Sequence, residues 1–374
     1  MTEAITTISG FSFVFCKEHG YRNVAPCPWP NCPNGIIGNK FRRGTSFKGE
    51  KEIIFERVRW TTVDGAERYV WKNNQLPSVF SVPNLCRDEL YRNIKEYPKV
   101  IYHYTDINSL QSIIEKQELW LTDFAYLNDS KEITHGIECT NDILKKKLSE
   151  SNDNSFSKLM QILHEQLDGQ SLPRICVLCF SVDDDSLGQW RGYGHGGKGV
   201  AIGIPTDSNY FSGFDELRLD LVLYDKQIQL DLIDNFIHFF SKAYETDRNY
   251  IHTKKEDIFL GLMQSTVYEF IPFFKDSSFA DEREARLIHI EHPSIYNEDL
   301  LKPAPKRFRV SNDHLIPYCT TKDIARRFDK RLPIGEIIIG PQPDKEFVKR
   351  GMREFLDATQ YQETIIRISK IPYR

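Results

Sequence analysis

Residues 25–35 limit the fold of this chain more than any other stretch of the sequence. They hold four prolines, two cysteines and one glycine, in the order APCPWPNCPNG. Proline fixes φ and lacks an amide hydrogen, so a segment this rich in proline supports neither a helix nor a central strand. The sequence therefore predicts structure built from loops, which needs a cross-link or a metal ion to hold it.

Four residues in and around this stretch have the spacing of zinc ligands. Cys16 and His19 are separated by two residues, and Cys27 and Cys32 by four. Zinc takes four such ligands in a tetrahedron, and its binding would supply the folding free energy that a segment poor in apolar residues lacks. We expect a structural zinc site, and the alternative is a set of unrelated thiols beside a surface histidine.

The composition is that of an ordinary globular protein, with 40% hydrophobic and 27% charged residues among 374. A net charge of −4 gives no overall attraction to nucleic acid or to a membrane surface. The eight cysteines are spread through a chain that does not begin with a secretory signal, which favours reduced thiols and a cytoplasmic location. No stretch approaches the ~18 consecutive apolar residues of a membrane helix.

From Pro98 onward, apolar residues recur with the periods of short strands and of amphipathic helices. Strands are expected at residues 100–104, 119–122, 175–181, 200–204, 285–290, 308–310, 316–319, 337–339 and 364–368. Helices are expected after an N-cap at Asp106 and at residues 130–167, 186–193, 228–244, 257–274 and 345–356. Because the strands are short and the helices come in blocks, we expect an α+β domain over residues 98–374. Residues 1–97 would form the zinc-binding module and a connecting segment.

The first candidate for chemistry is His103, in the apolar strand Ile101-Tyr102-His103-Tyr104-Thr105. A histidine in such a strand is costly unless its ring nitrogens are satisfied. The simplest explanation from composition is a core histidine that is bonded to backbone.

The second candidate is Cys179-Phe180-Ser181, followed by a short helix and a loop with glycines at 192, 194, 196, 197 and 199. So many glycines indicate a tight loop in which the backbone approaches another group closely. Gly197-Lys198 is followed by Gly199 rather than by serine or threonine, so the loop is not a P-loop. The alternative is a flexible hairpin.

The third candidate is the pair Glu282 and Glu284, two residues apart at the start of an apolar strand. Residues at this spacing point to the same face of a strand, and burial would raise at least one pKa unless cations or hydrogen bonds compensate. Such pairs suit chemistry that develops positive charge. The alternative is a solvated strand edge with salt bridges to Arg283 and Arg286.

Together these stretches resemble the layout of the ADP-ribosyltransferase superfamily. His103-x-Thr105 is similar to the first motif of the diphtheria-toxin and poly(ADP-ribose) polymerase branch and of DNA-modifying toxins. Phe180-Ser181 and Glu282-x-Glu284 resemble the serine and closing motifs of the arginine-targeting branch. From Tyr102 to Arg374 the chain also resembles a bacterial family described as domain of unknown function twenty-nine seventy-one. That resemblance rests on Tyr102-His103-Tyr104-Thr105, Leu127-Asn128-Asp129-x-x-Glu132, Cys179-Phe180-Ser181, Trp190-x-x-Tyr193, Glu282-x-Glu284-x-Arg286, Ile339-Gly340-Pro341 and Ile371-Pro372-Tyr373-Arg374.

The superfamily resemblance implies an NAD⁺-dependent ADP-ribosyltransferase with a split mixed sheet flanked by helices. Nicotinamide would leave the ribose C1′ through an oxocarbenium-like state, which carboxylates stabilise. Glu284 would bond the ribose 2′-OH, and Glu282 would position or activate the acceptor. The implied NAD⁺ contacts are His103, Tyr104 and Thr105 on the riboses and amide, Ser181 in support of Glu284, Trp190 or Tyr193 stacked on nicotinamide, and Arg191 or Lys198 at the pyrophosphate.

The sequence does not identify the acceptor, which could be a protein, a nucleic acid, a small molecule or water. Water as the acceptor would make the chain an NAD⁺ hydrolase. The character of the family suggests a toxin or a phage-defence effector. One alternative is a non-catalytic module that docks nucleic acid or protein through the zinc segment and the basic residues within 39–51. Another is a different hydrolase, active without NAD⁺, in which His103 is the base and Glu284 the acid.

Overall fold

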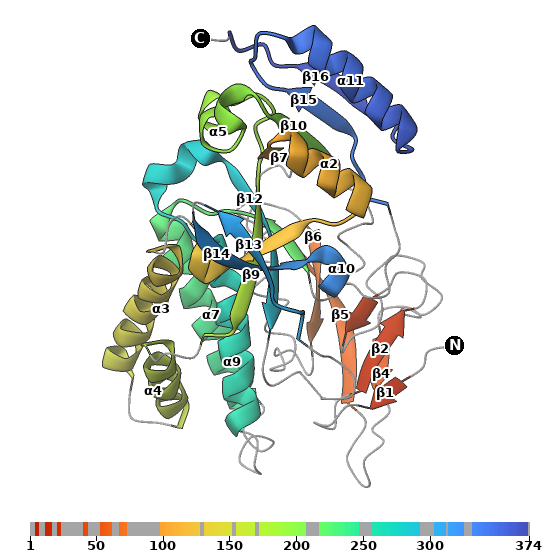
Figure 1. Cartoon of the computed structure of the whole chain (residues 1–374). Helices are drawn as coiled ribbons and strands as arrows, with labels where there is room; N and C mark the ends of the chain where they lie inside the picture. Colours follow the sequence, from red (N-terminus) through yellow and green to blue (C-terminus); the bar gives the residue numbers. More distant parts are fainter. Residues whose placement is uncertain are drawn as a thin grey trace. The chain divides into compact units, whose positions relative to one another are not determined.

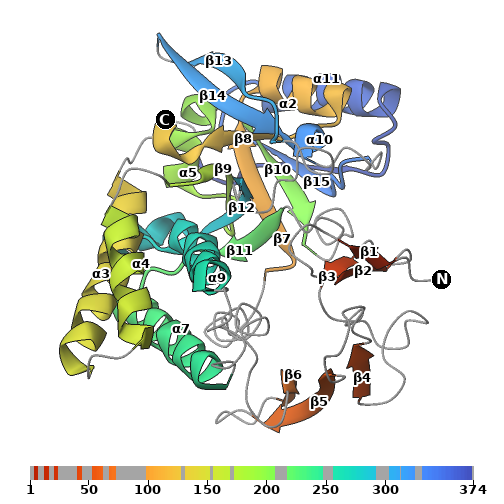
Figure 2. The same cartoon turned by 90° about the horizontal axis from the view of Figure 1, so that it is seen from below.

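The structure of the chain is a computed structural model (Figures 1 and 2). It describes residues 98–127, 131–151, 155–168, 172–206, 217–246, 256–291, 303–311, 313–324 and 331–372, together with six short strands before residue 73. These residues fall into two compact units. The first comprises Met1–Ile94, Ile137–Leu172 and Gln227–Ile271, and the second comprises Lys95–Gly136, Pro173–Lys226 and Pro272–Arg374. The sequence-based boundary at residues 97 and 98 stays a prediction.

The first unit contains two small antiparallel sheets and a group of helices. The sheets are β1 (Ala4–Thr6), β2 (Ser12–Cys16) and β3 (Tyr21–Asn23), and β4 (Lys40–Arg43), β5 (Ile53–Thr61) and β6 (Glu67–Lys72). The helices are α3 (Lys131–Glu150), α4 (Ser155–Asp168), α7 (Lys226–Thr246) and α9 (Glu256–Phe270), which are grouped in Figure 2. Phe259 contributes to their core, with the rings of Phe240 and Tyr244 at centroid distances of 5.5 and 5.4 Å.

Two of the expected helices differ from the structure. The single helix expected over residues 130–167 is two helices, α3 ending at Glu150 and α4 beginning at Ser155. The sequence between them, Ser-Asn-Asp-Asn, consists of residue types that disfavour a helix interior. The helix expected to run to Phe274 ends at Phe270 and continues as the 3₁₀ turn η4 (Ile271–Phe273). Within the described part of the chain, no helix has the length and apolar character to cross a membrane.

Ten strands of the second unit form one open mixed sheet, which confirms the expected α+β class with flanking helices. They are β7 (Val100–Thr105), β8 (Trp120–Asp123), β9 (Arg174–Ser181), β10 (Val200–Pro205), β11 (Arg218–Leu221), β12 (Glu284–Glu291), β13 (Arg307–Ser311), β14 (His314–Thr320), β15 (Glu336–Ile339) and β16 (Ile365–Ile368). The path runs β13-β14-β8-β9-β7-β10-β15-β16, and β12 pairs with both β9 and β11. Among these ten described strands, β15 and β16 pair in parallel and the other neighbours pair antiparallel.

The sheet divides at β9. One edge of β9 pairs with β12 along its whole length. The other edge pairs with β8 at Val177 and with β7 at Ser181, so β7 and β8 leave the same edge in two directions. We call this place the fork.

The remaining elements of the second unit are the helices α2 (Ile107–Lys116), α5 (Leu187–Gly192), α10 (Thr321–Ile324) and α11 (Lys345–Ala358), and the 3₁₀ turns η2 (Phe124–Tyr126), η3 (His195–Gly197) and η5 (Ser277–Glu282). Asp106 caps α2 as expected, because its carboxylate accepts a hydrogen bond from Ser109 N at 2.8 Å. Leu110 and Ile114 of α2 share a core with Leu356 of α11 and Phe180 of β9. This core covers one face of the sheet.

The opposite face of β9 and β12 is apolar at one end and polar at the other. Val177 and Ile288 lie opposite each other in a smaller core with Phe273. One and two steps further along the same face are the pairs Cys179↔Arg286 and Ser181↔Glu284. Because side chains alternate along a strand, Glu284 and Arg286 lie on the same face as the smaller core, at the polar end beyond its apolar residues.

Candidate functional site

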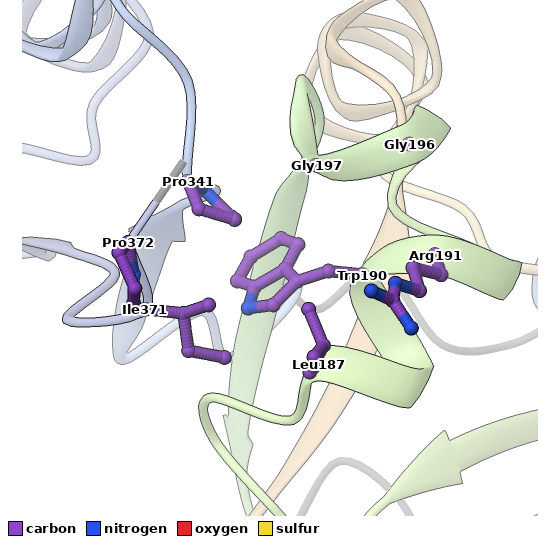
Figure 3. Close-up of a pocket in the computed structure, with 8 residues that line it drawn as sticks. All are labelled: Leu187, Trp190, Arg191, Gly196, Gly197, Pro341, Ile371 and Pro372. Atoms are coloured by element: carbon purple, nitrogen blue, oxygen red, sulfur yellow. The ribbon is translucent and has the colours of Figure 1, made fainter. Parts of the chain in front are cut away.

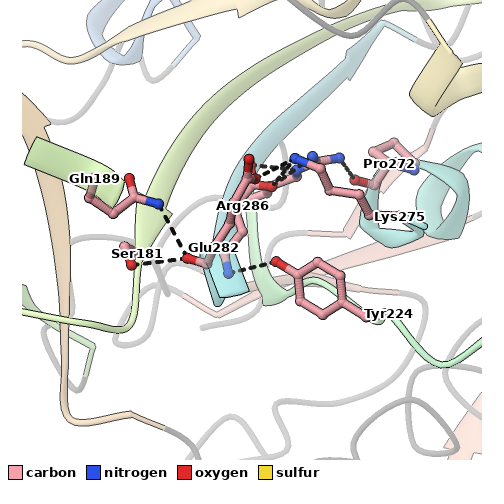
Figure 4. A network of polar contacts seen from close by, with 8 residues as sticks. Ser181, Gln189, Tyr224, Pro272, Lys275, Glu282 and Arg286 are labelled. Atoms are coloured by element: carbon pink, nitrogen blue, oxygen red, sulfur yellow. Dashed lines mark hydrogen bonds and ion pairs between the residues drawn. The ribbon is translucent and has the colours of Figure 1, made fainter. Parts of the chain in front are cut away.

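The site is centred on Lys275, whose ammonium group binds both candidate glutamates. Its Nζ donates to Glu282 Oε2 at 2.6 Å and to Glu284 Oε2 at 3.1 Å. Arg286 adds a two-pronged contact to Glu284, from Nε to Oε1 at 2.9 Å and from Nη2 to Oε2 at 2.8 Å. Figure 4 shows these contacts and the bond from Arg286 Nη1 to Pro272 O at 2.6 Å.

The two carboxylates come together from two different elements, whereas the sequence predicts that both lie on one strand. Glu284 begins β12, but Glu282 ends the 3₁₀ turn η5 and is not part of the strand. Arg283 between them has φ 43°, a left-handed conformation that is uncommon outside glycine. Its side chain binds Asp183 at 2.5 Å, which ties the turn to the segment after β9.

The alternative expectation for Glu282 and Glu284, a solvated strand edge with salt bridges to Arg283 and Arg286, is partly correct. Arg286 does pair with a glutamate, but the pair is shielded from solvent rather than solvated: 1% of the Arg286 side chain and 7% of the Glu284 side chain are exposed. Burial by itself would raise the pKa of Glu284, but the charge and hydrogen bonds of Arg286, with the charge of Lys275, lower it below its ordinary value. Glu284 is therefore ionised at neutral pH. Glu282 is the accessible carboxylate, with 29% of its side chain exposed.

Three polar groups hold the backbone around the carboxylates. Ser181 Oγ and Gln189 Nε2 both donate to Glu282 O, at 3.1 and 3.4 Å. The backbone N of Glu284 donates to Tyr224 Oη at 2.9 Å. Ser181 thus supports the backbone of Glu282. The superfamily resemblance instead implies that Ser181 supports Glu284, the residue opposite Ser181 in the pairing of β9 and β12.

His103 lies at the fork. Its Nδ1 is 3.1 Å from Cys179 O, on the edge of β9 between the residues that pair with β8 and with β7. Because a carbonyl oxygen only accepts, Nδ1 carries the proton. Burial lowers the pKa of His103, and the nearby charge of Arg309 lowers it further, so the ring is neutral at neutral pH. This is the backbone-bonded histidine that composition favours.

Two exposed aromatic residues belong to the elements around the carboxylates: Phe279, whose ring centroid is 5.0 Å from Lys275 Nζ, and Tyr193. Tyr193 is the C-cap residue that follows α5, and half of its surface, 50%, is exposed. Burial of its hydroxyl raises the pKa of Tyr193 to about 12, and the negative charge of Glu282 contributes to the same shift. The hydroxyl of Tyr193 is therefore protonated at neutral pH.

Trp190 and Tyr104 are packed inside the second unit. Trp190 is fully buried, its ring meets that of Tyr104 edge-on at 4.7 Å, and its Nε1 donates to Asp185 at 2.7 Å. Tyr104 Oη donates to Asp183 O at 2.8 Å. Both rings hold the segment between β9 and α5, and neither offers an open face beside the carboxylates.

A cavity of about 300 Å³ lies next to Trp190 (Figure 3). It is lined by Leu187, Trp190, Arg191, Gly196, Gly197, Pro341, Ile371 and Pro372. The structure brings Trp190 and Arg191 together here, as a wall and an exposed cation of the same cavity. Lys198 is exposed as well, and Thr105 is buried in β7.

The glycine loop makes the close backbone approach that its composition predicts. A Cβ at Gly199 would clash with the backbone oxygen of Thr105, and Gly197 has φ 90°. These glycines let the chain turn from α5 into β10 directly beside β7. The glycine-rich segment is therefore a closely packed connection between α5 and β10.

The predicted zinc ligands His19, Cys27 and Cys32 lie outside the described residues, as do Asn128, Asp129, Tyr373 and Arg374 of the family motifs. Cys16 is the last residue of β2. Among the residues that the structure describes, no three His, Cys, Asp or Glu side chains are grouped as for a metal ion. The zinc site stays a prediction.

Lys275 is the member of the site that sequence reasoning missed. It follows Phe273-Phe274 in a loop and is only 5% exposed. A lone cation directly after an apolar run is the one local signal for it. Cys179 belongs to the Cys179-Phe180-Ser181 motif, and its thiol hydrogen bond also lowers the pKa of Glu284.

Comparison with known proteins gives one match. Residues 189–287 match the model of a family described as "Protein of unknown function (DUF2971)". The matched range runs from α5 into β12 and includes Tyr193, Lys275, Glu282, Glu284 and Arg286. The expected resemblance to this family is confirmed over these residues. No curated protein and no solved structure matches the chain.

Proposed function

We propose that this chain, whose residues 189–287 match the family of unknown function DUF2971, is an NAD⁺-dependent ADP-ribosyltransferase. The observation that carries the proposal is the convergence of Glu282 and Glu284 on Lys275. A carboxylate pair of this kind suits the loss of nicotinamide from ribose, because the sugar passes through an oxocarbenium-like state whose positive charge a carboxylate offsets.

The two carboxylates would have different roles. Glu284 is buried and held ionised, so it supplies a fixed negative charge and an acceptor for the ribose 2′-OH. Glu282 is more exposed and would take the proton of the acceptor. As the C1′–N bond breaks, its electron pair goes to the nicotinamide nitrogen, and the acceptor then forms the new bond to C1′.

The surroundings of the pair also support the proposal. The sheet divides at the fork beside the carboxylates, in keeping with the split mixed sheet that the superfamily resemblance implies. Tyr193 is the better candidate to stack on nicotinamide, because its ring is half exposed whereas that of Trp190 is fully buried. His103 would face the ligand as a neutral ring.

The experiment is nicotinamide release from NAD⁺, measured for the wild type and for Glu282→Gln. Glu282→Gln should lower the rate about 100-fold or more, because it removes an acid–base group. Glu291→Gln is the matched control: Glu291 lies at the far end of β12 in its own ion pair, 2.9 Å from Arg174. Equal loss in both variants would point to damage of the strand. No release by the wild type under any condition, with or without cell lysate as a source of acceptor, would refute the proposal.

A second function is favoured by one specific observation. Both oxygens of Glu284 already accept hydrogen bonds from cations, which leaves less room for a ribose hydroxyl. A non-catalytic module on a transferase-like fold, which binds nucleic acid or protein through its zinc segment, would keep such a closed network. It would bind its partner with no turnover of NAD⁺, and Glu282→Gln would leave that binding unchanged.

The acceptor, the zinc site and the cellular role belong to the same proposal. Release that depends on lysate would indicate transfer to a protein or nucleic acid, and release without it an NAD⁺ hydrolase. A structural Zn²⁺ bound by Cys16, His19, Cys27 and Cys32 would order the N-terminal module. The chain would act in the cytoplasm, as a toxin or a phage-defence effector.

A further inference from the structure

Strand β13 has the reverse of the usual alternation between core and solvent. Its apolar residues point outward, with Phe308 58% and Val310 74% exposed. Arg309 between them is partly buried. A strand at the end of a sheet normally turns its apolar side chains inward, so the inward position of a cation needs an explanation.

Arg309 is poorly satisfied where it lies. Its Nη2 donates to Thr122 Oγ1 at 3.0 Å, and its Nε is shielded from solvent without a hydrogen-bond partner. Among the described residues it has no carboxylate within 4.0 Å, whereas the shielded cations Arg174, Arg218, Lys275 and Arg286 each have one. Burial accordingly lowers the pKa of Arg309. A guanidinium carries five N–H donors, and the Nε–H of Arg309 is one that the described protein leaves without an acceptor.

The position of Arg309 is on the face of the sheet that carries the carboxylates. Thr122 of β8 pairs with Val177 of β9, and directly opposite residues point to the same face. That face continues through Cys179 and Ser181 toward Glu284. Thr122, which Arg309 binds, lies on β8, one of the two strands that leave β9 at the fork.

We propose that Arg309, positioned by Thr122, binds a phosphate group of a nucleotide ligand at the fork. Arginine binds phosphate through parallel charge-assisted hydrogen bonds, and a partly buried site strengthens them. A ligand that spans from Arg309 toward Glu282 would be a nucleoside diphosphate sugar such as ADP-ribose. Only this extension to NAD⁺ rests on the proposed function, because phosphate binding requires no turnover.

A purely structural role is the competing explanation. An inward-pointing charge on an edge strand discourages pairing with other chains. In that case Arg309→Gln would change aggregation or stability and leave ligand binding unchanged. The two explanations therefore predict different results in one binding experiment.

The experiment is calorimetric titration of the full chain with ADP-ribose and with inorganic pyrophosphate. Arg309→Gln should weaken ADP-ribose binding about tenfold or more, because charge-assisted bonds are lost. Arg309→Lys should recover part of the affinity, since it keeps the charge but not the planar donors. Arg307→Gln is the matched control: Arg307 lies two residues away on β13 and is bound by Asp323 at 2.7 and 2.8 Å. It should bind ADP-ribose as the wild type does.

The outcomes separate this inference from the proposed function. Arg309-dependent binding of ADP-ribose, displaced by pyrophosphate, supports the phosphate site even if nicotinamide is never released. Release of nicotinamide together with an unchanged affinity in a folded Arg309→Gln variant overturns the site and leaves the transferase proposal standing. Binding of pyrophosphate but not of ADP-ribose overturns the assignment to a nucleotide.

Discussion

The side chains of Glu284 and Arg286, two residues apart on β12, are joined by two hydrogen bonds of 2.9 and 2.8 Å. Both side chains are buried, so each compensates a charge that solvent does not reach. Removing one partner leaves the other as an unpaired buried charge. Removing both leaves no unpaired charge from this pair. The pair can therefore be tested for stability separately from its chemistry.

Glu284→Gln should lower the free energy of unfolding by about 3 kcal/mol at neutral pH, because Arg286 loses its carboxylate. The folded pKa of Glu284 lies below its ordinary value of 4.5, so its contribution is present above pH of about 4.5 and is lost as the pH falls through the folded pKa. Urea unfolding of wild type and variant between pH 3 and pH 7 measures this. The double variant Glu284→Gln, Arg286→Met should recover most of the stability and none of the activity. A single variant as stable as the wild type would contradict the ion-pair argument.

His103→Phe should lower the free energy of unfolding by about 1–3 kcal/mol, because Cys179 O loses its donor while the ring contact with Phe180 is kept. The folded pKa of His103 is lowered from 6.5, so the unfolded chain binds the proton first and the wild type loses stability as the pH falls below about 6.5. The variant should lack that part of the pH dependence. Melting temperatures from pH 5 to pH 8 test this, and parallel profiles for both proteins would show that His103 does not titrate.

Tyr193→Ala should slow nicotinamide release about tenfold and leave the melting temperature nearly unchanged, because half of the ring is already exposed. Tyr193→Phe keeps the ring and should retain most of the activity. Steady-state kinetics at saturating NAD⁺, with thermal unfolding as the control, distinguish the two variants. Equal activity in Tyr193→Ala and wild type would exclude stacking by this ring.

Removal of zinc should unfold the N-terminal module without stopping nicotinamide release. Metal analysis of the purified chain should find about one zinc ion per chain for four ligands, and Cys27→Ser should lose it. Proteolysis within residues 1–97 should then become faster. Full zinc content in Cys27→Ser would refute the ligand assignment.

Local patterns in the sequence are enough to predict most elements of the second unit. Asp106 is a correct N-cap because capping depends only on residues within one turn. The apolar runs at residues 175–181 and 200–204 are strands because alternation and β-branched side chains are local properties. The break between α3 and α4 was missed because helical periodicity continues on both sides of it.

Less of the candidate site than of the fold could be predicted from the sequence. Glu282 and Glu284 were identified, but the turn at Arg283 that separates them depends on contacts with Asp183, 100 positions earlier. Lys275 joins both carboxylates through the path of a loop, which no periodic pattern encodes. The inward position of Arg309 follows from the register between β13 and β14, and register is set by the assembled sheet.

The fork has a consequence for how the protein is made. Ser181 and the backbone oxygen of Glu282 that it binds are 101 positions apart, and β12 is needed along the whole of β9. While the ribosome has delivered only the first half of the chain, β9 has no partner on that edge and the carboxylates do not yet exist. The proposed activity would therefore require the synthesis of β12. A chain truncated before β12 lacks Glu284 and the strand that pairs with β9, so on the proposed function no nicotinamide release is expected until β12 has been translated.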